Sequence, residues 1–210
     1  MNTLKFGIPF ALLVSFSLLA PVHGADLAPA AEERNYDEDW YWGFNIGGGS
    51  MKYTDPTVQN DAETLKARPG MRHATLYFDI HFLWPMENRQ TAIGVGLGGV
   101  TDSYEQGGVK LNIRTSLLTF SALHYFSSNI GDGAFGQAEI GLASADAEAY
   151  GSGVTVRSEA NNGTGIRLGL GYAFLLSKET RLPFTVLWQR ANLKNNSGSN
   201  AVLFTVGMLF

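Results

Sequence analysis

The last eleven positions of the chain, residues 200–210, carry a large apolar side chain at every second position. Val202, Phe204, Val206, Met208 and Phe210 therefore share one face of an extended strand, because successive side chains of a strand point to opposite faces. A face that is wholly apolar must lie against an apolar phase, either a protein core or a membrane. The same period of two recurs through most of the chain.

Seven further stretches alternate with period two rather than with the 3.6-residue period of a helix. Eight strands in all is an even number, as single-chain bacterial barrels require. The sequence thus predicts an all-β fold, an eight-stranded antiparallel up-and-down transmembrane β-barrel over residues 40–210. The seven additional apolar faces hold Trp42, Phe44 and Ile46; Leu76, Phe78, Ile80, Phe82 and Trp84; Ile93, Val95 and Leu97; Val109, Leu111, Ile113 and Leu117; Ala138, Ile140 and Leu142; Ile166, Leu168, Leu170 and Tyr172; and Phe184, Val186 and Trp188.

The amino-terminal segment has Lys5, an apolar run over residues 6–20 and small residues at Gly24 and Ala25. This order predicts a secretory signal peptide over residues 1–24, followed by a flexible acidic leader over 25–39. The apolar run is shorter than the ~20 residues that a membrane-spanning helix needs. The sequence has no Cys, which excludes a lipoprotein anchor, disulfides and thiolate metal sites. We expect export to the cell envelope and insertion in the outer membrane.

The side chains opposite the apolar faces indicate which face meets lipid. A soluble barrel would expose Lys, Glu, Thr and Gln there, whereas these positions are mostly Gly, Ala and Asn, and Gly accounts for 25 of the 210 residues. Small side chains suit the interior of an eight-stranded barrel, which is only just wide enough for side chains to fill. The small faces are therefore predicted to point inward and the large apolar faces to point to lipid.

A few charged residues fall on the faces predicted to point inward. Unpaired charges there would be costly, so we predict a structural network of ion pairs and hydrogen bonds that plugs the lumen. The formal net charge of −4 and the lack of a basic stripe exclude nucleic-acid binding. We expect neither a cofactor nor a bound metal. The predicted lumen network consists of Asp79, His81, Lys110, Arg114, Glu139 and Arg167.

The connections alternate between the two ends of the barrel. With the amino terminus in the periplasm, the outer loops are predicted at 54–73, 102–108, 147–163 and 194–199, and the inner turns at 85–90, 127–133 and 177–181. Aromatic side chains should gather at the inner membrane interface, where one end of the ring is wet. The aromatic residues predicted there are Trp40, Trp42, Trp84, Phe126, Phe135, Phe174, Phe184 and Phe210.

Three segments resemble a known family: the opening Trp40–Gly49, the sequence Ala138–Leu142 and the terminal strand that ends at Phe210. Together they are similar to the small outer-membrane β-barrels that include the OmpA transmembrane domain, OmpX and the opacity-like surface proteins. The resemblance implies a monomer that contacts outer-membrane lipid and lipopolysaccharide, and a barrel-assembly machinery that reads Phe210. It implies a structural or surface-interaction role, in envelope integrity or adhesion, and no catalysis, although this fold hosts several functions.

One segment offers an enzymatic alternative. Residues 122–129 resemble the His-Tyr-Ser-Asn segment of lipid A deacylases of the PagL type, which would make the protein a lipid A- or phospholipid-modifying enzyme. Phe126 separates Tyr125 from the first serine, which changes the spacing between His124 and that serine. We therefore expect an interface histidine rather than a catalytic triad.

Three other functional possibilities each have a structural explanation. An OmpW-like conduit for small hydrophobic molecules would need an open, apolar lumen, and the inward charges oppose it. Residues 94–99 fit a dinucleotide-binding glycine motif, but no helix follows them, so small inward residues explain the pattern. Asp79, His81 and Glu139 could form a metal or proton-relay site, yet Arg114 and Arg167 would compete with a cation, which favours structural pairing.

Overall fold

The computed structural model describes residues 39–126, 129–151, 154–177, 179–194 and 198–210. The side chains of residue 154 and of residues 160–162 are not among those described. The predicted signal peptide, 1–24, and all but the last residue of the predicted leader, 25–39, lie outside the described part of the chain.

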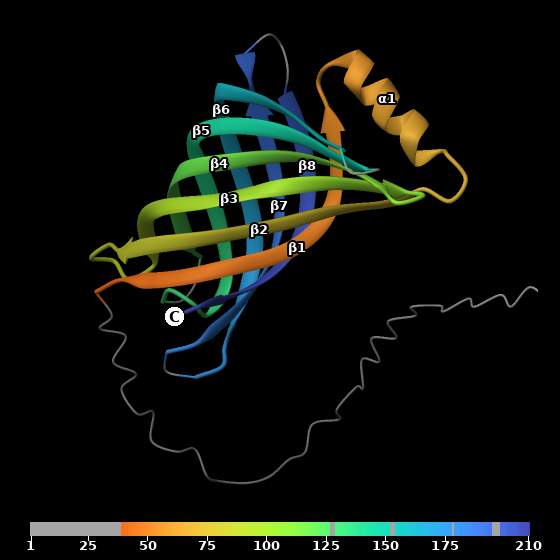
Figure 1. The fold of residues 1–210 in the computed structure, drawn as a ribbon. Coiled ribbons are helices and arrows are strands. Elements are labelled where there is room, and N and C mark those ends of the chain that lie inside the picture. Colours follow the sequence, from red (N-terminus) through yellow and green to blue (C-terminus); the bar gives the residue numbers. More distant parts are fainter. Residues whose placement is uncertain (1–38, 127–128, 152–153, 178, 195–197) are drawn as a thin grey trace, which may run out of the picture. The chain divides into compact units, whose positions relative to one another are not determined.

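Eight strands form a closed antiparallel barrel in which each strand pairs with its neighbours in the sequence and β8 pairs with β1 (Figure 1). This confirms the predicted fold class. In chain order the elements are β1 (Tyr41–Tyr53), α1 (Pro56–Lys66), β2 (Arg72–Pro85), β3 (Thr91–Gln106), β4 (Val109–Tyr125), β5 (Gly133–Gly151), β6 (Val154–Leu175), β7 (Arg181–Asn192) and β8 (Gly198–Leu209). The end of the barrel that holds α1 is called the loop end, and the end where β1 starts and β8 finishes is called the terminal end.

The strand register fixes the tilt of the barrel. The row of paired residues that starts at Trp42 of β1 passes through all the other strands and returns to β1 at Lys52, ten residues further along, from position 42 to position 52. An offset of this kind requires strands that tilt by roughly 35–45° from the barrel axis. A row of laterally paired residues therefore shifts from the terminal end toward the loop end as it is followed around the barrel.

Large apolar side chains point outward from the barrel and are exposed, with Phe120 at 74% and Leu170 at 67%. Charged side chains lie inside, where Asp79 and Arg167 have no exposed surface. The predicted orientation of the faces is correct for seven of the strands and wrong for the first half of β4.

In β4 the inward side chains are at odd positions, so that Leu117 is 1% exposed and its neighbour Leu118 is 55% exposed. The prediction placed Lys110 and Arg114 in the lumen, but both are exposed on the outer face near the loop end. The predicted outward face was Val109, Leu111, Ile113 and Leu117, but Leu117 packs inside the barrel with Ala143 and Ala191. Nearer the loop end, a strand that extends beyond an apolar phase is no longer required to turn its apolar side outward.

The loop predicted at 54–73 contains a helix. Pro56 begins α1, and the carboxylate of Asp55 accepts hydrogen bonds from the backbone N–H groups of Thr57 and Val58 at 2.8 and 3.3 Å. An Asp cap followed by Pro is typical of a helix start. In the described residues no helix is long and apolar enough to cross a membrane.

Two other predicted loops are largely strand. β3 runs to Gln106, and only Gly107 and Gly108, with φ of 59° and 82°, separate it from β4. Such a two-residue turn requires positive φ, which Gly adopts without strain. β5 and β6 extend to residues 151 and 154, across most of the loop predicted at 147–163, and their register shifts near Ala143. The predicted loop 194–199 overlaps residues 195–197, which are outside the described part.

The connections at the terminal end are short, and they join β2 to β3, β4 to β5 and β6 to β7 near the predicted turns. Aromatic side chains point outward at this end, including Trp42, Trp84 and Phe174. Phe135 is an exception to the prediction, because it is 2% exposed and packs inside the barrel.

Candidate functional site

The lumen is filled by alternating apolar and polar layers. The terminal end is closed by an apolar cluster, and along β2 the residues run from Leu83 of that cluster through His81 and Asp79 to Tyr77 of a second apolar cluster. The terminal cluster consists of Tyr41, Leu83, Ala92, Leu123, Tyr125, Ile130, Phe135, Ala173 and Leu209. The second consists of Met51, Tyr77, Val100, Leu187, Ala201 and Leu203.

Between these clusters lies a buried ion cluster formed by Asp79 of β2, His81 of β2, Glu139 of β5 and Arg167 of β6. Nη1 of Arg167 lies 2.8 Å from Oε2 of Glu139 and 3.5 Å from Oδ2 of Asp79. All four residues are buried. The structure thus brings together four of the six residues predicted to form the lumen network, with β2 supplying two of them and the consecutive strands β5 and β6 one each.

His81 lies between the two carboxylates. Its Nδ1 is 3.5 Å from Oδ1 of Asp79, and its Nε2 is 3.0 Å from Oε1 of Glu139. Three potential ligand atoms of these residues lie within 4.8 Å of one another, but a metal ion needs ligand atoms that converge on one point. Because the carboxylates face different ring nitrogens, the geometry fits a hydrogen bond between His81 and Glu139 and a looser contact with Asp79 better than metal ligation.

Neutral polar side chains complete the cluster, and the sequence prediction missed them. The hydroxyl of Thr119 donates to Glu139 at 2.7 Å, and Oε1 of Gln189 accepts from Nε and Nη2 of Arg167 at 3.2 and 3.1 Å. The prediction included only charged residues. These neutral side chains also occupy inward-facing positions of their strands. The other neutral partners are Asn45 and Tyr77, which donate to Asp79, and Gln137, which donates to Glu139.

A third buried carboxylate, Asp102 of β3, lies near the loop end, in a segment predicted as a loop. It receives hydrogen bonds from four side chains of β1, β2 and β3. The distances are 2.7 Å from Nε2 of His73, 2.7 Å from the hydroxyl of Thr75, 2.9 Å from that of Tyr53 and 2.6 Å from that of Tyr104. This arrangement ties three strands together above the ion cluster.

The residues considered for catalysis or nucleotide binding lie at the terminal end of β4 and inside β3. Nδ1 of His124 lies 3.0 Å from the hydroxyl of Thr91 on the outer side of the terminal end, and the two serines at 127 and 128 lie outside the described residues. The glycine motif at 94–99 is inside β3. A Cβ at Gly94 would lie 1.9 Å from the backbone oxygen of Phe82, so close strand packing explains that glycine.

The fold and the filled lumen define the chain as a closed, eight-stranded barrel with an apolar outer face and a lumen of alternating apolar and polar layers. No family model and no curated protein sequence matches the chain. Among solved structures it is similar to Ail, the attachment invasion locus protein of Yersinia pestis, with a TM-score of 0.51 and 10% identity over 82% of this chain and 100% of that chain. A structure of Ail with the heparin analogue sucrose octasulfate gives a TM-score of 0.52 with the same identity and coverage.

Neisserial surface protein A is similar as well, with a TM-score of 0.50 and 11% identity over 82% of this chain and 96% of that chain. At these identities the likeness concerns the fold. The chain has the fold of the small bacterial outer-membrane barrels.

Proposed function

We propose that the chain is an integral outer-membrane protein with a plugged lumen, that it serves envelope integrity or surface attachment, and that it performs no catalysis. The observation that carries the proposal is the inverted distribution of side chains. Phe120, Leu170 and Phe204 are 65–74% exposed on the outside, while Asp79 and Arg167 are fully buried inside.

This distribution is unfavourable in water, because exposed apolar surface costs roughly 25 cal/mol for each Å². It is the distribution expected of a barrel whose outer face meets hydrocarbon and whose backbone groups are all paired within a closed sheet. A membrane location therefore accounts for both the apolar outer face and the buried ions.

The outer membrane is the proposed location because the expected signal peptide at 1–24 would direct export and because bacterial barrels of this kind reside there. We further propose that the barrel is monomeric, contacts phospholipid and lipopolysaccharide, and is folded by the assembly machinery with Phe210 as the recognised residue. Phe210 lies at the seam, where its backbone exchanges hydrogen bonds with Trp42 at 3.0 and 2.8 Å.

The layered lumen supports a structural role rather than transport. The apolar cluster at the terminal end, the ion cluster and the Asp102 cluster follow one another along the interior. A conduit for small hydrophobic molecules would require an open, apolar path, and the described side chains fill that space.

The loop end is the part we propose for surface attachment. It holds α1 and the extension of β5 and β6, in which residues 154–159 pair with β5, while the described β6–β7 pairing starts at Thr164. An open strand edge can pair with a strand of another protein. The name of Ail, which shares the fold, refers to attachment and invasion.

The test is fractionation of cells that express the full chain, followed by gels of unheated and boiled samples and a lipid A mass profile. The proposal predicts the outer-membrane fraction, a heat-dependent mobility shift and unaltered lipid A. A soluble periplasmic protein without a shift would overturn the proposal. Loss or transfer of acyl chains would instead make the protein an enzyme.

A further inference from the structure

The outer face contains a hollow where small residues interrupt the large apolar ones. A single lateral row of paired residues crosses the barrel, and its only two alanines, Ala122 of β4 and Ala138 of β5, lie opposite each other. The row consists of Trp84, Ile93, Ala122, Ala138, Leu168, Trp188 and Val202. Two neighbouring short side chains therefore stand among bulky ones.

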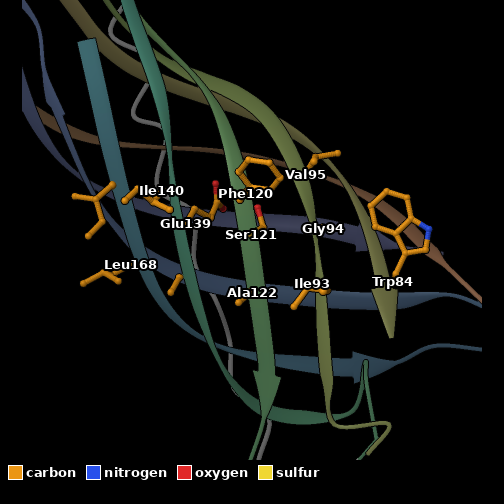
Figure 2. Close-up of a pocket in the computed structure, with 12 residues that line it drawn as sticks. Trp84, Ile93, Gly94, Val95, Phe120, Ser121, Ala122, Glu139, Ile140 and Leu168 are labelled. Carbon is orange, nitrogen blue, oxygen red and sulfur yellow. The ribbon is translucent and has the colours of Figure 1, made fainter. Parts of the chain in front are cut away.

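The adjacent rows make this gap a groove. Toward the loop end, Phe120 and Ile140 project from the same two strands and are 74% and 66% exposed. Toward the terminal end, the next outward residue of β5 is Gly136. The small-residue floor thus consists of Ala122, Ala138 and Gly136, and Figure 2 shows Phe120, Ile93 and Leu168 around Ala122.

The hollow above Ala122 and Ala138 has a volume of about 550 Å³. A second hollow of about 660 Å³ shares Ala122, Ala138 and Leu168 with it and continues toward Gly136 and His124. The two hollows meet over Ala122, Ala138 and Leu168, and both are lined almost entirely by carbon. We treat them as one groove, which spreads across β2 to β8 and reaches the terminal end at His124 and Gly136.

The terminal end of the groove is polar. His124 is the next outward residue of β4 after Ala122, and its Nδ1 is held by the hydroxyl of Thr91 at 3.0 Å. The ring of Phe126 meets the imidazole edge to face at 5.8 Å. Among the described residues Nε2 of His124 has no hydrogen-bond partner, so it can donate to an oxygen atom beyond the protein.

We propose that this groove is a binding site for one phospholipid, with an acyl chain over the small-residue floor and the headgroup phosphate or ester oxygens at Nε2 of His124. The inference rests on the proposed membrane location. A hydrocarbon chain gains dispersion contacts in a groove of side chains that it cannot gain on a flat surface. A polar group at one end matches the amphipathic build of a phospholipid, whereas a wholly apolar partner would offer no acceptor to Nε2 of His124.

The occupant is a phospholipid of the leaflet at the terminal end. His124 and Trp84 both lie near that end, and under the proposed topology it faces the periplasm. The groove is open along its length, so a lipid can enter sideways from the bilayer without a rearrangement of the barrel.

The site can be tested with the full barrel in phospholipid vesicles that contain a phospholipid with a photoreactive group on one acyl chain. After irradiation, labelled peptides are located by mass spectrometry. We expect labelling to concentrate on the β4 and β5 peptides around Ala122 and Ala138, several-fold above that of the β1 peptide around Ile46, which is exposed on the outer face away from the groove. Ala138→Phe should abolish this excess, whereas Leu97→Phe, on the outer face beyond the groove, should preserve it.

The headgroup contact is tested separately by native mass spectrometry of the barrel released from vesicles. His124→Phe should lower the number of retained phospholipids, and His124→Gln, which keeps a donor, should restore it. Both variants are checked for the heat-dependent mobility shift, which reports a folded barrel.

Even labelling of the whole apolar face by a barrel that is inserted and heat-modifiable would overturn the lipid site and leave the proposed membrane role intact. The site would also be overturned if Ala138→Phe kept the excess. A protein that stays outside the vesicles would contradict the proposed membrane role, and the site with it.

Discussion

The buried carboxylates in the lumen of this barrel are stabilised by individual side chains, above all by Arg167. Arg167 contacts both carboxylates of the ion cluster, and its guanidinium also lies 5.1 Å from the ring centre of Tyr77. Each carboxylate has its other oxygen near His81. Among the described residues, removing Arg167 would leave the two acids with His81 as the one basic side chain near both of them.

Arg167→Met should destabilise the barrel by ~3–5 kcal/mol, because breaking a buried pair leaves uncompensated charge. Urea unfolding in lipid vesicles measures the loss. Arg114→Met is the matched control, since Arg114 is exposed on the outer face and surface substitutions usually change stability by less than ~0.5 kcal/mol. Equal unfolding midpoints for the two variants would show that the cluster is not held by Arg167.

At the scale of elements, the closing pair β1–β8 is the seam on which the barrel depends. Trp42 and Phe210 stack across it with ring centres 4.7 Å apart, and their backbones exchange two hydrogen bonds. The two residues come from the two ends of the described barrel, so this contact forms only when the sheet closes.

Phe210→Ala should lower the yield of folded barrel, since a stacked aromatic pair contributes ~0.5–1.5 kcal/mol beyond its buried area. The folded fraction is read from the unheated band on a gel. Phe126→Ala removes an exposed aromatic ring at the same end but away from the seam, and it should have a smaller effect. A folded yield that falls equally in both variants would argue against a special role of the seam.

The helix α1 is an element that depends on its cap. Asp55→Ala removes the acceptor for two backbone N–H groups and should cost ~0.5–2 kcal/mol of local stability. Hydrogen exchange over residues 56–66 should quicken, while that of β1 and β2 stays constant. Asp61→Ala, an exposed residue within the helix, should leave exchange nearly unchanged, and equal acceleration would disprove the capping role.

For the whole molecule, the period of two along the strands was sufficient to predict the barrel, the number of strands and most inward residues. The pattern of period two predicted inward residues wrongly where the strand leaves the apolar phase that causes the alternation. Residues 109–113 of β4 and the extension of β5 and β6 lie toward the loop end, where neither lipid nor a tight lumen imposes a pattern on the side chains.

The ion cluster was only partly predictable for a different reason. Charge in an inward position identified Asp79, His81, Glu139 and Arg167, but hydrogen-bond partners such as Gln189 depend on how strands distant in sequence face each other. Asp102 was missed because the strand that carries it is longer than its apolar part. The groove on the outer face likewise needs the register, which places Ala122 opposite Ala138.

In the proposed orientation the apolar outer face of the barrel contacts lipid and the lumen does not. Leu117 and Leu118 are neighbours in β4, and only the second is exposed. Because the natural sequence has no Cys, Leu118→Cys and Leu117→Cys can each carry one fluorescent label in vesicles that contain a lipid-chain quencher. We predict strong quenching at position 118 and little labelling or quenching at position 117. Equal quenching at both positions, or the reverse order, would contradict the barrel's proposed orientation in the membrane.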